Sequence, residues 1–176
     1  LQTPFYRSED QLTTLTARES SIPCMDIDGD GMVEWPVSTR LPGYETASAD
    51  SALWKTTWME WDYATRQSRQ EFSCVMNDQD GYYVLFDDSW EGRVTAIYDK
   101  DARLLQFRLV GEGTSVDPFL SFKTSASSDS SAESDGYVVL SQLSGVQYSV
   151  RFTKESPFDL NMERVRYMFS LLPADR

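Results

Sequence analysis

The chain has 176 residues, of which 40% are hydrophobic and 13% aromatic, enough apolar material for one domain with its own core. Sixteen basic residues face twenty-eight acidic ones, and the formal net charge of -12 makes a nucleic-acid backbone or an anionic membrane surface a poor partner. The chain has no histidine, which excludes Ser-His-Asp triads, Cys-His pairs and histidine-bound zinc, so we expect any bound metal to be a hard cation with oxygen ligands.

The N-terminal part of the chain is polar. Residues 1–22 are rich in serine and threonine and have little hydrophobic periodicity. We expect them to form an extended segment that lies on the surface or adds an edge strand. An acidic loop from Asp26 to Glu34 follows, and a polar connector containing Leu41-Pro-Gly-Tyr44 then runs to Ser51.

The middle of the chain is predicted to form strands. The spacing of the tryptophans in Trp54–Tyr63 fits a helix or a strand, but its paired threonines and aromatic residues favour a strand. We expect Arg69–Met76 to pair with it. Asn77–Gly81 is predicted as a hairpin turn with Gly81 at positive φ, rather than as a short cation loop. Tyr82–Phe86 is the next strand.

Two further hairpins are predicted. Arg93–Tyr98 and Arg103–Val110 flank a short turn-forming stretch. Gly136–Leu140 and Val146–Phe152 flank Ser144-Gly145 in the same way. In the last of these strands apolar and polar residues alternate, which indicates a sheet with one buried and one solvated face.

The end of the chain changes character. Residues 125–135 include no apolar residue larger than alanine, and we expect them to form a flexible loop between strands. Apolar residues then recur every three or four positions, as on one face of a helix; they are Phe158, Met162, Val165, Met168, Phe169 and Leu172. Ser156–Asp159 would cap this helix and Pro173 would end it.

These elements predict a single domain over residues 1–176. Its fold class would be α+β and mainly β, with an antiparallel sheet or sandwich and one C-terminal helix packed on it. No run of eighteen apolar residues occurs, so no membrane-spanning helix is expected. Because the chain begins with Leu1, we interpret it as a mature or truncated part of a longer product whose targeting segment is gone.

The two cysteines, Cys24 and Cys74, do not make a disulfide framework. We expect both to be buried free thiols. A single disulfide between them remains an alternative in an oxidising compartment.

The acidic loop carries four carboxylates and two glycines in nine residues. Such carboxylates repel one another unless a cation binds among them, and Ca²⁺ takes six to eight oxygens at about 2.3–2.6 Å. A bend at Gly31, which tolerates positive φ, would let alternate side chains point inward. The expected ligands are Asp26, Asp28, Asp30, the backbone carbonyl of Met32, and Glu34. The alternative is a solvated turn that only connects two segments.

The spacing of these acids resembles a known cation loop. A twelve-residue EF-hand loop would need an acid where Val37 stands, and helical flanks that the sequence lacks. The pattern D-x-D-x-D-G-x-x-E is similar to the nine-residue calcium loop of FG-GAP and integrin-type β-propeller repeats, in which the last ligand is usually aspartate where this chain has Glu34. The resemblance implies a structural Ca²⁺ site, and a single loop does not imply a propeller.

A wider resemblance covers most of the chain. Its segments, in order, are Asp26–Gly31, Leu41–Tyr44, Trp58–Asp62 and Tyr82–Thr95. Their order is similar to the C-terminal region of secreted lipoproteins of Gram-positive bacteria. The resemblance implies an extracellular or cell-surface location, with a lipid anchor in the full-length protein, and implies no particular chemistry.

Two other groups of residues could carry function. Flat indole rings could stack on sugars, although most tryptophans in small β domains belong to the core; the candidates are Trp54, Trp58, Trp61 and Trp90. Paired carboxylates in Asp87–Glu91 could act on a glycosidic bond, although adjacent acids in a turn are usually solvated surface.

The sequence therefore predicts a non-enzymatic extracytoplasmic domain with a structural Ca²⁺ loop, whose partner is a cell-surface protein or glycan and not a nucleic acid. One alternative is a carbohydrate-binding or glycan-processing module with an aromatic platform. Another is a protein-interaction domain whose exposed sheet edge or acidic face binds a basic partner.

Overall fold

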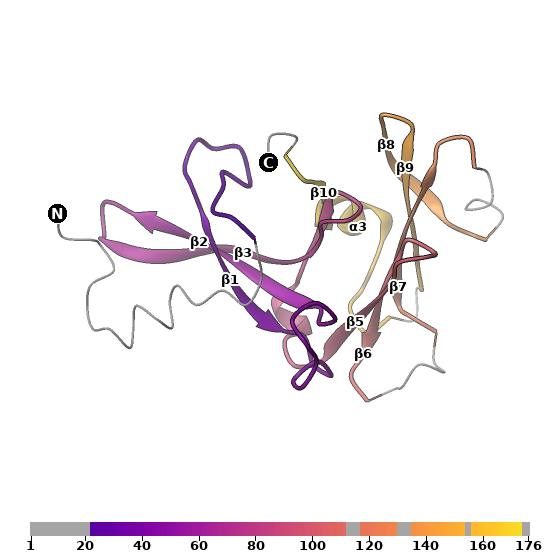
Figure 1. Ribbon diagram of the computed structural model, residues 1–176, viewed down its shortest axis with the longest axis horizontal. Helices are drawn as coiled ribbons and strands as arrows, with labels where there is room; N and C mark the ends of the chain where they lie inside the picture. The colour runs from indigo at the N-terminus through magenta and orange to yellow at the C-terminus, as the bar shows by residue number, and fades with distance from the viewer. Residues whose placement is uncertain (1–21, 112–116, 130–134, 154–155, 174–176) are drawn as a thin grey trace.

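The computed structural model describes residues 22–111, 117–129, 135–153 and 156–173. In these residues it contains two five-stranded antiparallel sheets and one α-helix (Figure 1). The predicted class, α+β and mainly β, is confirmed. The expected N-terminal segment 1–22 lies outside the described residues, except for Ile22, which is buried.

The first sheet has the strand order β1-β2-β3-β4-β10. Its strands are β1 (Trp35–Arg40), β2 (Trp54–Asp62), β3 (Gln67–Asn77), β4 (Tyr82–Leu85) and β10 (Phe169–Leu171). The strand prediction for the tryptophan-rich segment and its pairing with the next strand are confirmed, because β2 and β3 pair from Thr56 opposite Cys74 onwards. The predicted turn between β3 and β4 also forms, with Gly81 at φ 75°.

The second sheet has the order β5-β6-β7-β9-β8. Its strands are β5 (Val94–Asp99), β6 (Leu104–Leu109), β7 (Leu120–Ala126), β8 (Val138–Leu143) and β9 (Val146–Phe152). Both predicted hairpins, β5–β6 and β8–β9, are confirmed. The expected loop 125–135 begins later than predicted, because Ser125 and Ala126 pair with β9 as the end of β7.

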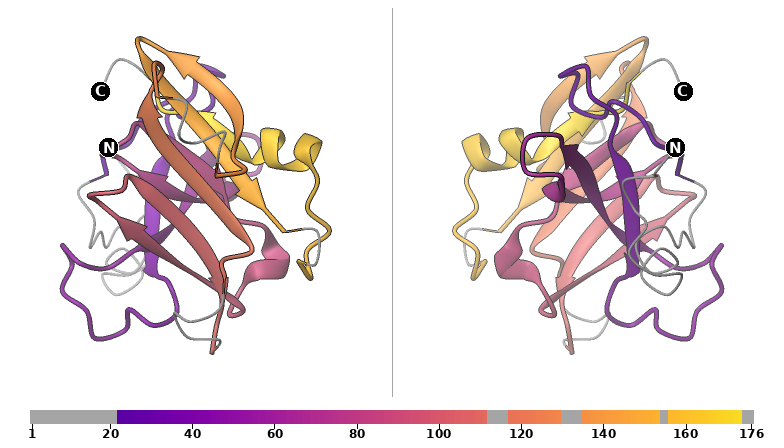
Figure 2. Two further views of the ribbon diagram at one scale, coloured as in Figure 1. Left: turned by 90° about the vertical axis from the view of Figure 1, so that its right-hand side faces the viewer. Right: turned by 90° about the vertical axis from the view of Figure 1, so that its left-hand side faces the viewer.

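The main core lies between the two sheets. Strand residues of both sheets contribute to one cluster of buried side chains, for example Val75 and Val84 from the first and Phe107 and Val150 from the second. In the left view of Figure 2 the strands of the second sheet pass in front of those of the first, and in the right view the order is reversed, as expected for two stacked sheets. The short 3₁₀ helix η1 (Asp88–Trp90) places Trp90, which has no exposed surface, in this core.

The C-terminal helix is shorter than predicted. Helix α3 covers only Met162–Met168, and its N-cap is Asn161, whose side chain accepts a hydrogen bond from the backbone N–H of Arg164. The prediction of a cap at Ser156–Asp159 is wrong, since Asp159 has φ 49° and interrupts any helix there. The segment after Met168 is strand β10, because its backbone pairs with the free edge of β4. In Figure 1 helix α3 lies beside β10, the edge strand of the first sheet.

A second, smaller cluster covers the opposite face of the first sheet. Successive strand residues point to opposite faces, so Val75 enters the main core while Cys74 enters this second cluster. Its buried members are Ile22, Ile27, Trp58, Cys74 and Tyr83. The segment that precedes β1 therefore packs on the outer face of β2, β3 and β4, and this packing positions the acidic loop.

Candidate metal centre

The acidic loop is closed by a pair of backbone hydrogen bonds. The N–H of Met25 donates to the carbonyl of Glu34 at 3.1 Å, and the N–H of Glu34 donates to the carbonyl of Met25 at 3.0 Å. Between them the chain turns through Gly29 and Gly31, at φ 82° and 89°, a region that side chains with a Cβ disfavour. The carboxylates are thereby gathered on one tight loop.

Within the loop the aspartates accept backbone hydrogen bonds. The two oxygens of Asp26 accept from the N–H groups of Gly29 and Gly31, at 2.7 and 2.9 Å. Asp28 accepts from the N–H of Asp30 at 3.2 Å. These bonds fix the backbone path, and they leave carboxylate lone pairs free for another partner.

The base of the loop is anchored in the protein. Ile27 is 4% exposed and packs in the second cluster with Trp58 and Tyr83. Glu34 is only 1% exposed, and its Oε2 accepts a hydrogen bond from the N–H of Ile27 at 2.9 Å. A carboxylate is therefore held inside the fold, directly beneath the exposed part of the loop.

Three of the predicted ligands come together. Asp26, Asp28 and Glu34 each offer an oxygen, and these oxygens lie within 4.8 Å of one another. Two oxygens that bind the same Ca²⁺ can be at most twice the metal–oxygen distance apart, about 4.6–5.2 Å. The arrangement is therefore compatible with one shared cation, although exposed acidic groups also occur without one.

The electrostatics of Glu34 are unfavourable for a free carboxylate. Burial raises its pKa, and the negative charges of Asp28 and Asp30 raise it further, against the lowering effect of the hydrogen bond from Ile27. None of the ion pairs between described residues involves Glu34. A divalent cation would supply the positive charge that the surrounding protein does not.

One further predicted ligand, Asp30, is placed differently. Asp30 lies outside the group of three, and its Oδ1 accepts a hydrogen bond from the backbone N–H of Met32 at 2.7 Å. Its role as a ligand, and that of the Met32 carbonyl, remain predictions. A cation held by the other three side chains would complete its shell with water or with these two groups.

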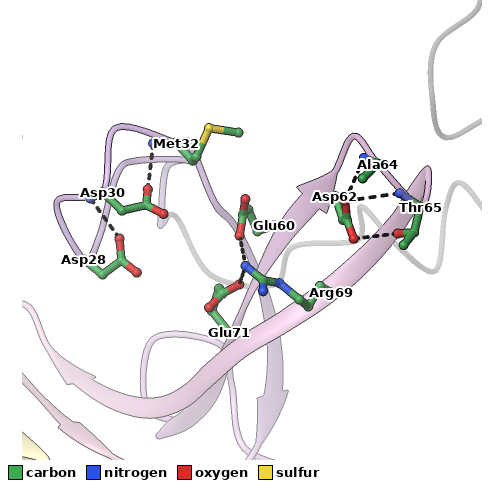
Figure 3. Close-up of polar contacts among 9 residues, drawn as sticks. All are labelled: Asp28, Asp30, Met32, Glu60, Asp62, Ala64, Thr65, Arg69 and Glu71. Atoms are coloured by element: carbon green, nitrogen blue, oxygen red, sulfur yellow. Dashed lines mark hydrogen bonds and ion pairs between the residues drawn. The ribbon is translucent and has the colours of Figure 1, made fainter.

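A charged triad on the first sheet lies next to the loop (Figure 3). Arg69 on β3 forms ion pairs at 2.6 Å with both Glu60 on β2 and Glu71. The hydrogen bond from Arg69 lowers the pKa of Glu60, whereas burial raises the pKa of Glu71, with further contributions from Glu60 and Asp28. The loop therefore faces additional negative charge. This triad was not predicted, because only the pairing of β2 with β3 brings it together.

The predicted aromatic platform does not form as a set of four. Trp58 and Trp90 have no exposed surface and belong to the second cluster and the main core. Trp54 and Trp61 are half-buried on β2. At least two of the four candidate tryptophans are therefore core residues, which is the usual role of tryptophan in a small domain.

Two of the three carboxylates of Asp87–Glu91 have structural partners. Asp87 accepts hydrogen bonds from the backbone of Ser89 and from Arg164 of α3, at 2.9 and 2.5 Å. Glu91 pairs with Lys55 of β2 at 2.5 Å. These contacts cap η1 and connect it to its neighbours, as expected for surface acids in a turn.

Neither cysteine forms a disulfide, as expected, but only one is buried. Cys74 is fully buried on β3, and burial raises its pKa to about 12. The expectation that Cys24 is also buried is wrong, because it is exposed just before the acidic loop.

Comparisons with protein-family models, with curated proteins and with solved structures found no match to this chain. Within its described residues, no helix is long and apolar enough to cross a membrane. Any conclusion on function therefore rests on the geometry of the acidic loop.

Proposed function

We propose that this chain is a non-enzymatic extracytoplasmic domain whose acidic loop binds one structural Ca²⁺ ion. The observation that carries the proposal is the buried carboxylate of Glu34, which faces Asp26 and Asp28 with ligand oxygens within 4.8 Å. Hard oxygen ligands from carboxylates are the set that Ca²⁺ prefers. The absence of histidine from the chain favours the same type of metal.

The ion would act mainly on stability. It would replace repulsion among three carboxylates with attraction to a shared charge, and it would hold the loop against β2 and β3. With a dissociation constant of ~10⁻⁴–10⁻³ M, in the range of extracellular modules, calcium at ~1 mM would add about 0.4–1.4 kcal/mol to the free energy of unfolding. Such a weak site would be filled outside the cytosol.

The proposed location at a bacterial cell surface, as part of a lipid-anchored protein, is supported by the order of sequence segments described above. The non-enzymatic character is supported by the contacts of Asp87 and Glu91, which engage two of the three acids considered for hydrolysis. The burial of Trp58 and Trp90, two of the four candidate platform residues, counts against the carbohydrate alternative.

Calcium binding to chelator-treated protein tests the proposal. We expect one ion per chain in the wild type and greatly weakened binding in Asp26→Asn. Binding that is absent from the wild type, or unchanged in the variant, would refute the metal site.

A further inference from the structure

Strand β3 is longer than its neighbour β4, and half of one edge has no partner. Strand β2 accompanies β3 as far as Gln67, but β4 pairs only with Cys74–Asn77. The last contact on the β4 side is a hydrogen bond of 2.7 Å, which the N–H of Phe86 donates to the carbonyl of Ser73. In the described part of the chain no strand lies beside Gln67–Phe72 on the β4 side, so about 20 Å of backbone edge is open on that side.

A groove runs along the inner end of this open edge. Its volume is about 270 Å³, and it lies between Gln70–Ser73 of β3, the chain that leaves β4, and helix α3. Its apolar lining includes Phe72, Leu85, Phe86 and Met168. Tyr167 of α3 stands at the groove with 77% of its surface exposed. The groove thus combines free backbone groups with an apolar lining.

The groove has an excess of negative charge. Asp87 is neutralised by Arg164. Glu71 shares Arg69 with Glu60, so one guanidinium serves two carboxylates. Asp88 is exposed, lines the groove and is in none of the ion pairs between described residues. Three acids of the lining, Glu71, Asp87 and Asp88, therefore face one arginine of the lining, Arg164.

We propose that this groove binds an extended peptide segment of a partner protein, which adds a strand to the open edge of β3. Backbone hydrogen bonds to Gln67–Phe72 would supply the pairing, as in other cases of strand addition. Small apolar side chains of the peptide would contact Phe72 and Met168. A lysine or arginine would meet Glu71, which shares Arg69 with Glu60, and Asp88, which is in none of the ion pairs between described residues.

The charge of the groove distinguishes this occupant from a second copy of the chain. Each copy has a formal net charge of -12, so self-association brings like charges together. A basic segment of a different protein is attracted by the same charge. This inference goes beyond the calcium loop and does not depend on it.

The test uses an acetylated, amidated octapeptide of alternating lysine and valine, titrated into the full chain in ~0.15 M salt at ~1 mM peptide. We expect amide shifts in two-dimensional NMR spectra that concentrate on Gln67–Ser73 and Tyr167. The same peptide with glutamate in place of lysine should bind at least ten-fold more weakly. The double variant Glu71→Gln with Asp88→Asn should weaken binding of the lysine peptide at least five-fold.

The matched control removes the same charge elsewhere. Asp50→Asn with Asp101→Asn changes two exposed acids outside the groove and should leave binding within two-fold of the wild type. Tyr167→Ala, at an exposed position, should weaken binding without affecting folding. The proposal is overturned by shifts that appear only at the acidic loop, by equal binding of the glutamate peptide, or by the absence of shifts. Shifts of the same amides that depend on protein concentration, with a doubled mass, would assign the edge to a second copy.

Discussion

Arg103 joins the two sheets through Asp80. The Nε of Arg103, just before β6, donates to Oδ1 of Asp80 in the β3–β4 turn at 2.6 Å, and the Asp80 side chain has no exposed surface. The other oxygen of Asp80 accepts from Asn77 at 2.9 Å and from Tyr98 at 2.8 Å. Burial, helped by the carboxylate of Asp80, raises the pKa of Tyr98 to about 12. The buried side chain of Asp80 thus accepts hydrogen bonds from residues of both sheets.

Replacing Asp80 should be costly. Asp80→Asn removes the ion pair with Arg103 and replaces one of the two acceptor oxygens with an NH2 donor, so we expect the free energy of unfolding to fall by about 2–4 kcal/mol. Urea unfolding followed by tryptophan fluorescence measures this change. The control Asp101→Asn, at an exposed position in the β5–β6 turn, should change stability by less than about 0.5 kcal/mol. Equal effects of the two variants would show that the Asp80 contacts do not stabilise the fold.

Calcium should raise the melting temperature slightly. A gain of about 0.4–1.4 kcal/mol at ~1 mM calcium corresponds to a rise of about 1–5 °C for a chain of this size. Differential scanning calorimetry with calcium and with excess chelator measures the difference. Asp26→Asn should remove it, whereas Asp101→Asn should retain it. A calcium effect of the same size in Asp26→Asn would place the ion elsewhere.

Glu34→Gln separates the structural role of this residue from its metal role. The glutamine carbonyl can still accept the hydrogen bond from Ile27, but the buried charge near Asp28 is removed. We therefore expect the metal-free variant to be more stable than the metal-free wild type, on the order of 1 kcal/mol, and to lose the calcium effect. Chemical unfolding in chelator measures the first result. Glu163→Gln, an exposed change on α3, is the control, and a metal-free Glu34→Gln protein less stable than wild type would contradict this account.

The gain from Glu34→Gln should depend on pH. The folded-state pKa of Glu34 is raised above 4.5, so the folded protein holds a proton on this side chain more tightly than the unfolded chain does. The stabilisation by this proton is fully present below pH 4.5 and is lost as the pH rises through the folded-state value. In chelator, the stability gap between the variant and the wild type should shrink as the pH falls from 7 towards 4.5. Unfolding free energies measured across this range give the gap. A gap that stays constant would mean that Glu34 titrates normally.

The two cysteines should differ in reactivity. Cys24 is exposed, whereas Cys74 is buried with a pKa of about 12. A thiol reagent at pH 8 should therefore modify one cysteine per native chain within minutes and two per unfolded chain. Mass spectrometry of the digested protein identifies the residue. Rapid modification of Cys74 in the native protein would contradict its burial on β3.

The elements that sequence patterns predicted best are those specified by neighbouring residues. The hairpin β8–β9 follows from Ser144-Gly145 at its turn and from the alternation in Val146–Phe152. The polar face of this strand was expected to be solvated, but Gln147 and Ser149 are buried. The helix was predicted too long because the apolar spacing of the helical segment continues into β10, the strand that follows it. The segment Phe169–Leu171 forms strand β10 because it pairs with the free edge of β4, which lies more than eighty residues earlier in the chain. No local sequence pattern indicates this pairing.

The candidate site also has some features that neighbouring residues specify and others that depend on distant contacts. The alternating acids predicted that Asp26, Asp28 and Glu34 converge, because a glycine-containing loop of nine residues constrains them locally. The burial of Glu34 depends instead on Ile27 packing against Trp58 on β2, and the nearby acids Glu60 and Glu71 depend on strand pairing. Long-range contacts of this kind have no signal in a single sequence.

Equilibrium dialysis against ⁴⁵Ca²⁺ tests the central claim most directly. The account predicts one ion bound per wild-type chain, half-saturated at ~10⁻⁴–10⁻³ M free calcium, and binding at least ten-fold weaker in Glu34→Gln. Bound calcium at ~5 mM that is no higher in the wild type than in Glu34→Gln would contradict a cation shared by Asp26, Asp28 and Glu34.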